Sequence, residues 1–190
     1  MLTLESFEQA SEIVKQVTQE TKLIKSSYFS ELTGNKVYLK PENMQLTGAY
    51  KLRGAYYKIS TLSEEERAKG LITASAGNHA QGVAYAAHKF GIPATIVMPE
   101  SAPIAKIQAT EGYGAKVILH GSCYDDAYEM ACTVCETEGS TFLHPYNDLD
   151  VIAGQGTLGL EILGDLPTAD VVIVPAGGGG LLAGIAACIK

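Results

Sequence analysis

Short apolar segments alternate with longer amphipathic segments along the whole of this chain. The apolar segments have the length and residue types of strands, whereas those between them have helical length and end at glycine or proline. Such alternation predicts right-handed βαβ units, which form a parallel sheet with helices on both faces. The expected strands are LITASA (71–76), PATIVMP (93–99), AKVILHG (115–121), STFLHP (140–145) and ADVVIVP (169–175), the last of them buried.

Other elements are predicted from local signals. Apolar positions at helical spacing indicate a helix over 5–19, and NKVYLKPEN (35–43) is typical of a short strand. A helix is expected to open near Lys51 and to be followed by a polar surface turn over 63–70. Gly91 suits the C-terminal cap of one helix, and Ser122 the N-terminal cap of another.

The charge and the apolar runs limit the function classes. The 190 residues carry a formal net charge of −7 and no basic cluster, so a nucleic-acid partner is not expected. No apolar run reaches the length of a membrane span, and the acidic N-terminus lacks the pattern of a signal peptide. We therefore expect a cytoplasmic protein without a membrane partner.

The cysteines and three isolated histidines indicate no metal site. Cys132 and Cys135 form a lone C-x-x-C inside a predicted helix, without the two further ligands that zinc needs. Such a pair is also not at a helix N-terminus, where a redox thiolate is stabilised. We interpret all four cysteines as reduced structural thiols. His88, His120 and His144 fit surface or hydrogen-bonded core positions.

Four consecutive glycines, Gly177 to Gly180, separate the last predicted strand from the last helix. Their exposed N–H groups and the helix N-terminus favour an anion such as a phosphate. A tight turn and a Rossmann dinucleotide loop, with Gly178, Gly180 and Ala183 as G-x-G-x-x-A, are the alternatives. A second such pattern, Gly154-x-Gly156-x-x-Gly159, indicates close helix packing.

The loop SAGNH (75–79) joins a predicted strand to a predicted helix. Its N–H groups converge on one point, where a small anion such as a carboxylate could be held, and Ser75 and Asn78 offer side-chain donors. The alternative is simply a capped helix start, since serine and asparagine both cap well.

Lys51 lies at the start of a predicted helix among apolar residues, in TGAYKLRGA (47–55). The helix N-terminus disfavours a positive charge, and burial would act in the same direction, so we expect a lowered pKa. A neutral lysine amine is what Schiff-base chemistry requires. A solvated surface lysine is the alternative for the residue taken alone.

Five segments carry a resemblance to a known family: KPENMQLTGAYKLRGA (40–55), AGNHAQGVA (76–84), GIPATIVMP (91–99), VIAGQGT (151–157) and the glycine run. Together they resemble the fold-type II pyridoxal-phosphate enzymes, and most closely the threonine dehydratases and serine racemases. The resemblance implies α/β architecture like that of the tryptophan-synthase β subunit, with three-layer parallel sheets. It also implies pyridoxal 5'-phosphate as cofactor and an amino acid as substrate.

The resemblance also implies roles for individual residues. Lys51 would form a Schiff base with the cofactor and later act as the base at Cα. Tyr50, where relatives usually have phenylalanine, would lie by the cofactor ring, and Asn78 would bind the ring oxygen O3. The remaining implied contacts are those of Ser75, Ala76, Gly77, Asn78 and His79 with the substrate carboxylate, and of Gly177, Gly178, Gly179, Gly180 and Leu181 with the cofactor phosphate.

The implied reaction is the conversion of L-threonine or L-serine to a 2-oxo acid and ammonia. The alternatives are a serine racemase and a non-catalytic nucleotide-binding module. Related racemases have a serine base where this chain has Ala76, and alanine cannot exchange a proton, so elimination is favoured. Ala49 replaces a usual serine without removing a reactive group.

Members of the resembled family are considerably longer, so the large domain is expected to be incomplete. We predict that residues 1–50 belong to the large domain, 51–145 form the small α/β domain, and 146–190 return to the large domain. Uncovered apolar strand and helix faces would then be exposed. We therefore expect this 190-residue chain to bind the cofactor weakly, to turn over slowly or not at all, and to form homo-oligomers.

Overall fold

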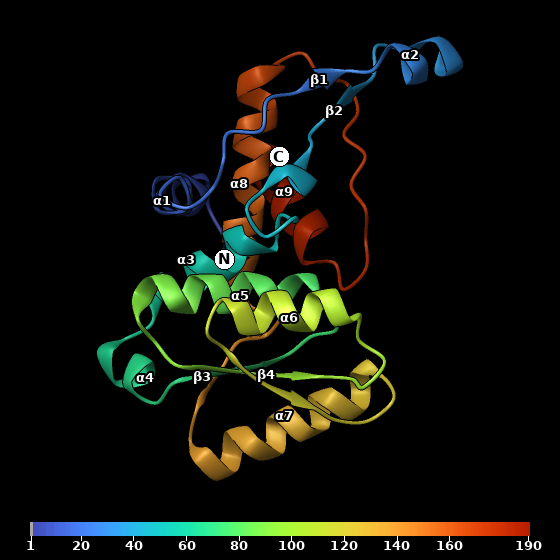
Figure 1. Cartoon of the computed structure of the whole chain (residues 1–190). Coiled ribbons are helices and arrows are strands. Elements are labelled where there is room, and N and C mark those ends of the chain that lie inside the picture. The colour runs from blue at the N-terminus through green and yellow to red at the C-terminus, as the bar shows by residue number, and fades with distance from the viewer. Residues whose placement is uncertain (1) are drawn as a thin grey trace.

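In the computed structural model, which describes residues 2–190, a four-stranded parallel sheet forms the centre of one half of the molecule (Figure 1). Its strands lie in the order β5-β4-β3-β6, and Leu71 of β3 is in register with Ala94 of β4 and with Thr141 of β6. The strand bounds are β3 Leu71–Ala74, β4 Ala94–Met98, β5 Lys116–Leu119 and β6 Thr141–Phe142. The predicted alternation of strands and helices is confirmed over this region.

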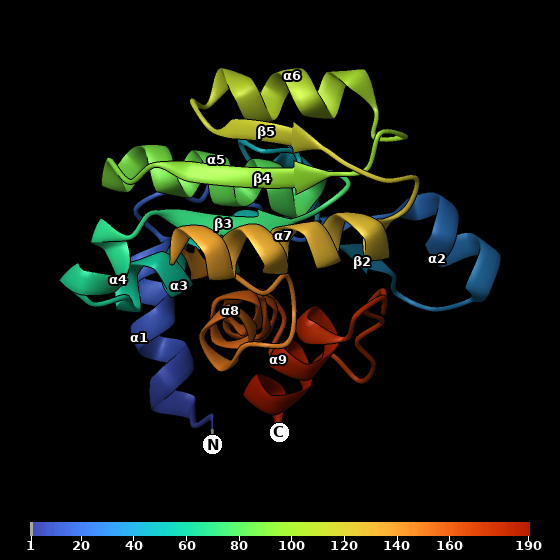
Figure 2. The same ribbon diagram turned by 90° about the horizontal axis from the view of Figure 1, so that it is seen from below.

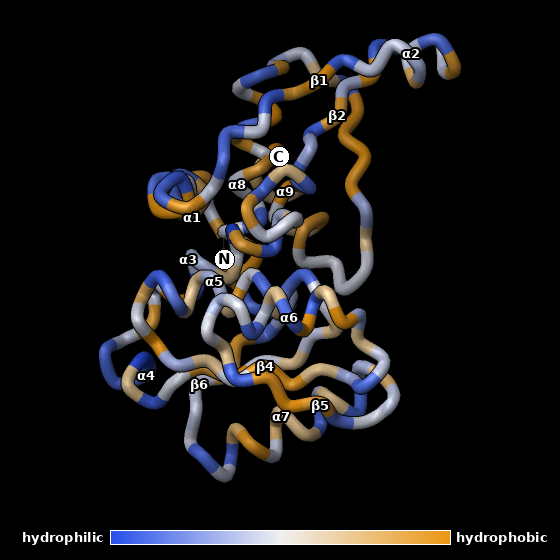
Figure 3. The backbone as a smooth tube through the Cα atoms, viewed as in Figure 1, coloured by the Kyte–Doolittle hydropathy of each residue, from blue (hydrophilic) through white to orange (hydrophobic). Residues whose placement is uncertain are grey.

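Helices cover both faces of this sheet, as the sequence predicts. α5 (Asn78–Phe90) and α6 (Ile104–Gly112) lie on one face, and α7 (Tyr124–Glu138) lies on the other (Figure 1). All four residues of β3 are buried, because helices pack on both sides of it. β4 and β5 are hydrophobic over most of their length (Figure 3), as expected for strands between two layers. The arrowheads of β3, β4 and β5 point the same way (Figure 2), so their carboxyl ends share one edge.

The rest of the chain packs mainly as helices on the far side of α5. α3 contacts both α5 and α8, and α8 also contacts α1 and α9. The helix bounds are α1 Leu4–Val14, α3 Lys51–Thr61, α8 Leu149–Asp165 and α9 Gly180–Ile189. A two-stranded antiparallel ribbon, β1 (Ile24–Lys25) with β2 (Tyr38–Leu39), flanks α2 (Ser27–Thr33) and is followed by the 3₁₀ turn η1 (Glu42–Met44).

The glycines of α8 allow close helix packing, as predicted. A Cβ atom on Gly154 would lie 2.6 Å from the Cα of Gly54 in α3, and one on Gly156 would lie 2.8 Å from the carbonyl oxygen of Gly184 in α9. The G-x-G-x-x-G pattern of α8 therefore serves helix contacts, and the helix places the returning chain next to α3.

A buried ion cluster ties α3 to η1 and α8. The Arg53 side chain is fully buried, and its Nε donates to Glu42 Oε2 at 2.8 Å, while Nη1 donates to Glu161 and to Thr157 Oγ1. Burial by itself would raise the pKa of Glu42, but the hydrogen bond and the charge of Arg53 outweigh it, and the pKa is lowered. Breaking such a pair by removing one partner typically destabilises a protein by about 3–5 kcal/mol.

The prediction of a buried strand over 169–175 is wrong. This segment is extended but pairs with no strand of residues 2–190, and Val171 and Ile173 are 77% and 91% exposed. An apolar segment becomes a strand only when another strand supplies hydrogen-bond partners, and none of the described residues does so here. The hydrophobic segment is visible beside α8 and α9 (Figure 3).

Smaller differences concern helix ends. The surface turn over 63–70 contains a short helix, α4 (Glu64–Ala68), capped by Ser63. Ser122 is not the N-cap of α7; Cys123 holds that position, and the Asp126 carboxylate accepts the N–H groups of both residues. α1 ends at Val14 rather than near residue 19. Gly91, with a φ of 67°, caps α5 as predicted.

None of the helices in residues 2–190 has the length and apolar character needed to cross a membrane.

Candidate functional site

A cleft of about 410 Å³ opens at the carboxyl edge of the sheet, where parallel α/β sheets commonly bind ligands. It brings together three sequence regions that lie far apart in the chain: the start of α3, the loop after β3 and the glycine run before α9. The lining residues are Lys51, Ala74, Ser75, Ala76, Gly77, Asn78, His79, Tyr124, Pro145, Tyr146 and Gly178.

Lys51 is the first residue of α3 and is held close to α5. A Cβ atom on Gly82 of α5 would lie only 3.1 Å from the carbonyl carbon of Lys51, so this glycine lets the two helices meet at the cleft. The Lys51 Nζ donates to the carbonyl oxygen of Pro145 at 2.7 Å. Burial lowers the pKa of Lys51 to about 8, and no carboxylate of the described residues counteracts this effect. The lowered pKa predicted from the sequence is confirmed.

The loop from Ser75 to His79 crosses the end of β3 and leads into α5. Ser75 is buried, and its Oγ accepts the N–H of Gly77 at 3.1 Å. Asn78 begins α5, and its Oδ1 accepts a hydrogen bond from Lys106 Nζ of α6 at 2.8 Å. Burial lowers the pKa of His79 to about 3, and the charge of Lys51 acts in the same direction, so its imidazole is neutral.

The glycine run approaches the cleft through Gly178. A Cβ atom on this residue would lie 2.4 Å from the Tyr146 ring, so only glycine fits here. Gly179 has a φ of 88°, in the left-handed region, and precedes the N-terminus of α9, which begins at Gly180. Successive N–H groups of such a bend, together with a helix N-terminus, attract an anion.

Tyr146 and Tyr124 were not singled out by the sequence patterns. Tyr124 is the first residue of α7, and within residues 2–190 its hydroxyl is buried without a hydrogen-bond partner. Burial raises the pKa of Tyr124 to about 12, so the hydroxyl stays protonated. An unpaired buried hydroxyl beside a cleft is suited to an oxygen or nitrogen atom of a ligand.

His144 fixes the turn that carries Pro145 and Tyr146. Its Nδ1 accepts the N–H of Tyr146 at 3.3 Å and that of Asn147 at 2.8 Å. A nitrogen that accepts cannot carry a proton, and burial lowers the pKa of His144, which favours the neutral ring. The histidine interpreted as an isolated core or surface residue thus supports the wall of the cleft.

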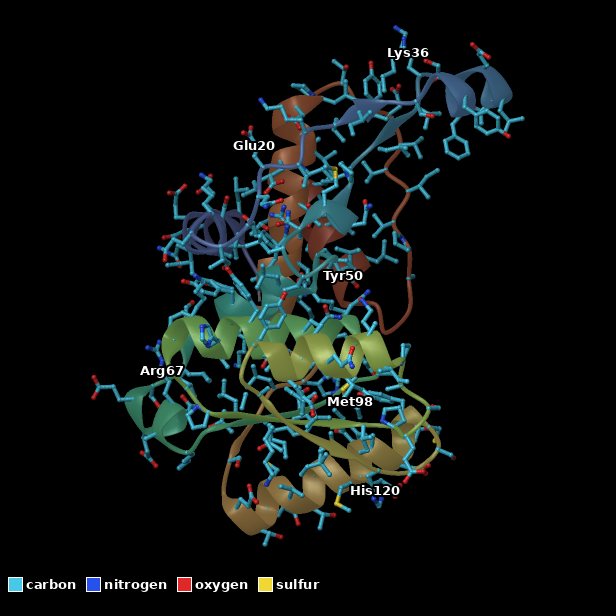
Figure 4. All side chains as sticks on the ribbon, in the orientation of Figure 1. Glu20, Lys36, Tyr50, Arg67, Met98 and His120 are labelled. Carbon is cyan, nitrogen blue, oxygen red and sulfur yellow. The ribbon has the colours of Figure 1, made fainter. Side chains whose placement is uncertain are left out.

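The remaining predicted site residues lie beside the cleft rather than in its lining. Tyr50 packs near Leu181 and Ile185, on the side of α5 away from the sheet (Figure 4), and its ring centre is 5.6 Å from Lys51 Nζ. Gly177 is exposed, whereas Gly180 and Leu181 are buried at the start of α9. Among the described residues there is no cluster of metal-ligating side chains, and Cys132 and Cys135 are free thiols one turn apart on α7.

A sequence profile described as "Pyridoxal-phosphate dependent enzyme" matches residues 14–190. The chain is 57% identical to an L-threonine ammonia-lyase of Thermotoga maritima, over all of this chain and 47% of that protein. It is 54% identical to an L-threonine dehydratase of Staphylococcus aureus, over all of this chain and 55% of that protein. The chain thus spans about half the length of the curated relatives it matches.

Solved structures give the same picture of the fold. The processed form of threonine deaminase isoform 2 from Solanum lycopersicum superposes with a TM-score of 0.91 at 42% identity, over 97% of this chain and 55% of that one. Maize serine racemase superposes with a TM-score of 0.94 at 37% identity, over 98% of this chain and 57% of that one.

Proposed function

Since the chain belongs to the family of pyridoxal-phosphate dependent enzymes, we propose that its cleft binds pyridoxal 5'-phosphate and that the protein acts as a threonine or serine ammonia-lyase. In this reaction L-threonine is converted to 2-oxobutanoate and ammonia. The observation that carries the proposal is the meeting of Lys51, the Ser75–His79 loop and Gly178 in one cleft.

The residues present fit this cofactor. The cleft has the volume of a small-molecule site, and it contains one lysine amine of lowered pKa. The bend at Gly178 and Gly179 offers N–H groups to a phosphate, and the Tyr124 hydroxyl, which no described residue hydrogen-bonds, could bind a polar atom of the cofactor. A bound cofactor of this class withdraws electrons from the substrate Cα, so that its proton becomes acidic.

Residues of the cleft would then bind the cofactor, orient the substrate and transfer a proton. Lys51 Nζ would hold the cofactor covalently, and after substrate binds it would accept the proton from Cα. The N–H groups of the Ser75–His79 loop would orient the substrate carboxylate, and the Asn78 amide would donate to the ring oxygen O3. Tyr50 would pack by the ring, and Gly177 to Leu181 would hold the phosphate. The neutral His79 adds no positive charge next to the Lys51 amine, which leaves that amine free to take a proton.

Elimination is favoured over racemisation by Ala76. This residue is exposed in the cleft lining, at the place where the racemases that the sequence resembles carry a serine base. A methyl group can neither remove nor return a proton. We therefore propose that the second face of the substrate meets no base from this loop.

The helix contacts support the proposed domain division. α8 packs on α1 and α9, which supports residues 1–50 and 146–190 forming parts of one domain, while 51–145 contain the parallel sheet; α3 packs on both α8 and α5, so it lies where the two proposed domains meet. We also propose that this chain self-associates, because the apolar side chains of Val171 and Ile173 are exposed. Sedimentation as a monomer at micromolar concentration would contradict that part.

The function is tested by adding L-threonine and pyridoxal phosphate to the 190-residue chain and measuring 2-oxobutanoate. We expect slow product formation that is lost in Lys51→Ala, with L-serine giving pyruvate and no rapid appearance of D-serine. Chiral chromatography that showed D-serine forming faster than pyruvate would contradict the proposed elimination. Product formation by Lys51→Ala at the wild-type rate would contradict the role of the lysine.

A further inference from the structure

Lys106 reaches from α6 to the loop that lines the cleft. Its Nζ donates to Asn78 Oδ1 at 2.8 Å, and its stem lies along the loop, since a Cβ atom on Gly77 would be 3.8 Å from Lys106 Cγ. Lys106 is half-buried and does not line the cleft itself. It therefore acts on the cleft only through Asn78 and the loop.

The hydrogen bond fixes which end of the Asn78 amide faces Lys106. An ammonium group has three donors and no acceptor, so the amide must turn its oxygen toward Lys106 and its NH₂ group away. Asn78 lines the cleft, and among the residues described its Nδ2 has no hydrogen-bond partner. The amide thus presents a donor, and not an acceptor, to a ligand.

We propose that Lys106 is a positioning residue, which holds the Asn78 amide as a hydrogen-bond donor to the ring oxygen O3 of the cofactor. This inference rests on the proposed function, in which Asn78 contacts that oxygen. The positive charge beside Oδ1 also draws electrons from the amide and strengthens Nδ2 as a donor. Without Lys106, the amide could rotate and place its own oxygen against O3, where two acceptors would repel each other.

The test substitutions are Lys106→Met and Lys106→Arg, with Lys116→Met as the matched control. Methionine keeps most of the stem that packs along Gly77 but removes the donor and the charge, whereas arginine keeps both. Lys116 is an exposed residue of β5 outside the cleft lining, so its substitution removes the same charge elsewhere. Binding of pyridoxal phosphate is measured by the absorbance of the bound cofactor over a range of pH.

We expect Lys106→Met to weaken cofactor binding about tenfold, which corresponds to about 1.4 kcal/mol. The pH at which the absorbance spectrum changes should also rise, because the lost donor no longer favours the ionised O3. Lys106→Arg should restore both properties toward wild type, and Lys116→Met should change neither. In an Asn78→Ala background, Lys106→Met should have no further effect, since the residue through which it acts is gone.

Two results would overturn the inference. The first is a Lys106→Met spectrum and affinity equal to those of Lys116→Met. The second is that Lys106→Met weakens cofactor binding equally in the wild-type and the Asn78→Ala backgrounds, which would show that Lys106 does not act through Asn78. Failure of the proposed function is distinguishable, because a mixture with the wild-type chain would then show only the absorbance of free pyridoxal phosphate. Melting temperatures of the three lysine variants show whether any loss comes from unfolding.

Discussion

The lowered pKa of Lys51 makes a measurable prediction about its reactivity. Burial shifts this pKa from 10.5 to about 8, so at pH 7 about one Lys51 amine in ten is neutral, against about one in three thousand for an amine at 10.5. Neutral amines react with acetic anhydride and with aldehydes, whereas ammonium groups do not. At pH 7 the neutral fraction of Lys51 is therefore roughly 300 times that of an ordinary lysine.

Competitive acetylation from pH 6 to 11, followed by peptide mapping, measures this directly. The Lys51 rate should rise with pH and level off with a midpoint near 8, while the exposed Lys116 serves as an internal reference for reagent reactivity. A Lys51 rate that still rises tenfold per pH unit between pH 9 and 10 would refute the reasoning.

The same shift has a consequence for stability, with a defined sign. Below pH 8 Lys51 is charged in both the folded and the unfolded chain, so its burial opposes folding. The shift of the Lys51 pKa from 10.5 to about 8 corresponds to a loss of folding stability of about 3 kcal/mol at most. This loss disappears as the pH rises from 8 to 10.5. Lys51→Met should therefore be more stable than wild type in urea at pH 7, with the difference shrinking above pH 8. A difference that stays constant up to pH 10.5 would contradict this.

Three further outcomes are expected. Gly154→Ala should lower the free energy of unfolding by about 1–3 kcal/mol, because the new Cβ atom would clash with α3. Gly164→Ala on the same helix has open space around it and should be neutral or stabilising. Equal effects of the two substitutions in urea titrations would refute the close-packing explanation. Arg53→Met should lower the free energy of unfolding by about 3–5 kcal/mol. It should also remove the stability that Glu42 contributes above its unfolded pKa and loses as pH falls through its lowered folded pKa. A decrease below about 1 kcal/mol would show that the ion cluster is not stabilising. Gly178→Ala should weaken pyridoxal phosphate binding at least about tenfold, and adding Tyr146→Ala should recover part of it by making room; no recovery would mean that the Tyr146 ring is not the obstacle.

The sequence predicted the two inner strands of the sheet, β3 and β4, well, because they are buried on both faces and so consist mostly of apolar residues. Leu71–Ala74 and Ala94–Met98 are of this kind. The segment around Val171 and Ile173 has the same composition and yet is exposed, because no strand among the described residues pairs with it. In the ribbon, β2 lies within the short strand predicted over 35–43, whereas the two residues of β1 were not predicted because so short a strand has no periodic signal.

The predicted site residues that line the cleft were those in distinctive motifs, such as Lys51 and Asn78. Tyr124 and Tyr146 were missed because a tyrosine in a loop or at a helix start has no pattern of its own. Both, however, follow shortly after predicted strands, at the sheet edge where ligands bind. A polar residue that directly follows a predicted strand is therefore a candidate site residue even when it belongs to no motif. Lys106 could not be found in this way, since its contact with Asn78 depends on how α6 packs on α5.

Borohydride reduction with pyridoxal phosphate, followed by peptide mapping, tests most directly that Lys51 holds the cofactor in this cleft. We expect one pyridoxyl group per chain, on Lys51, with none on the exposed Lys116. Labelling spread evenly over surface lysines, or absent from Lys51, would contradict the proposed site.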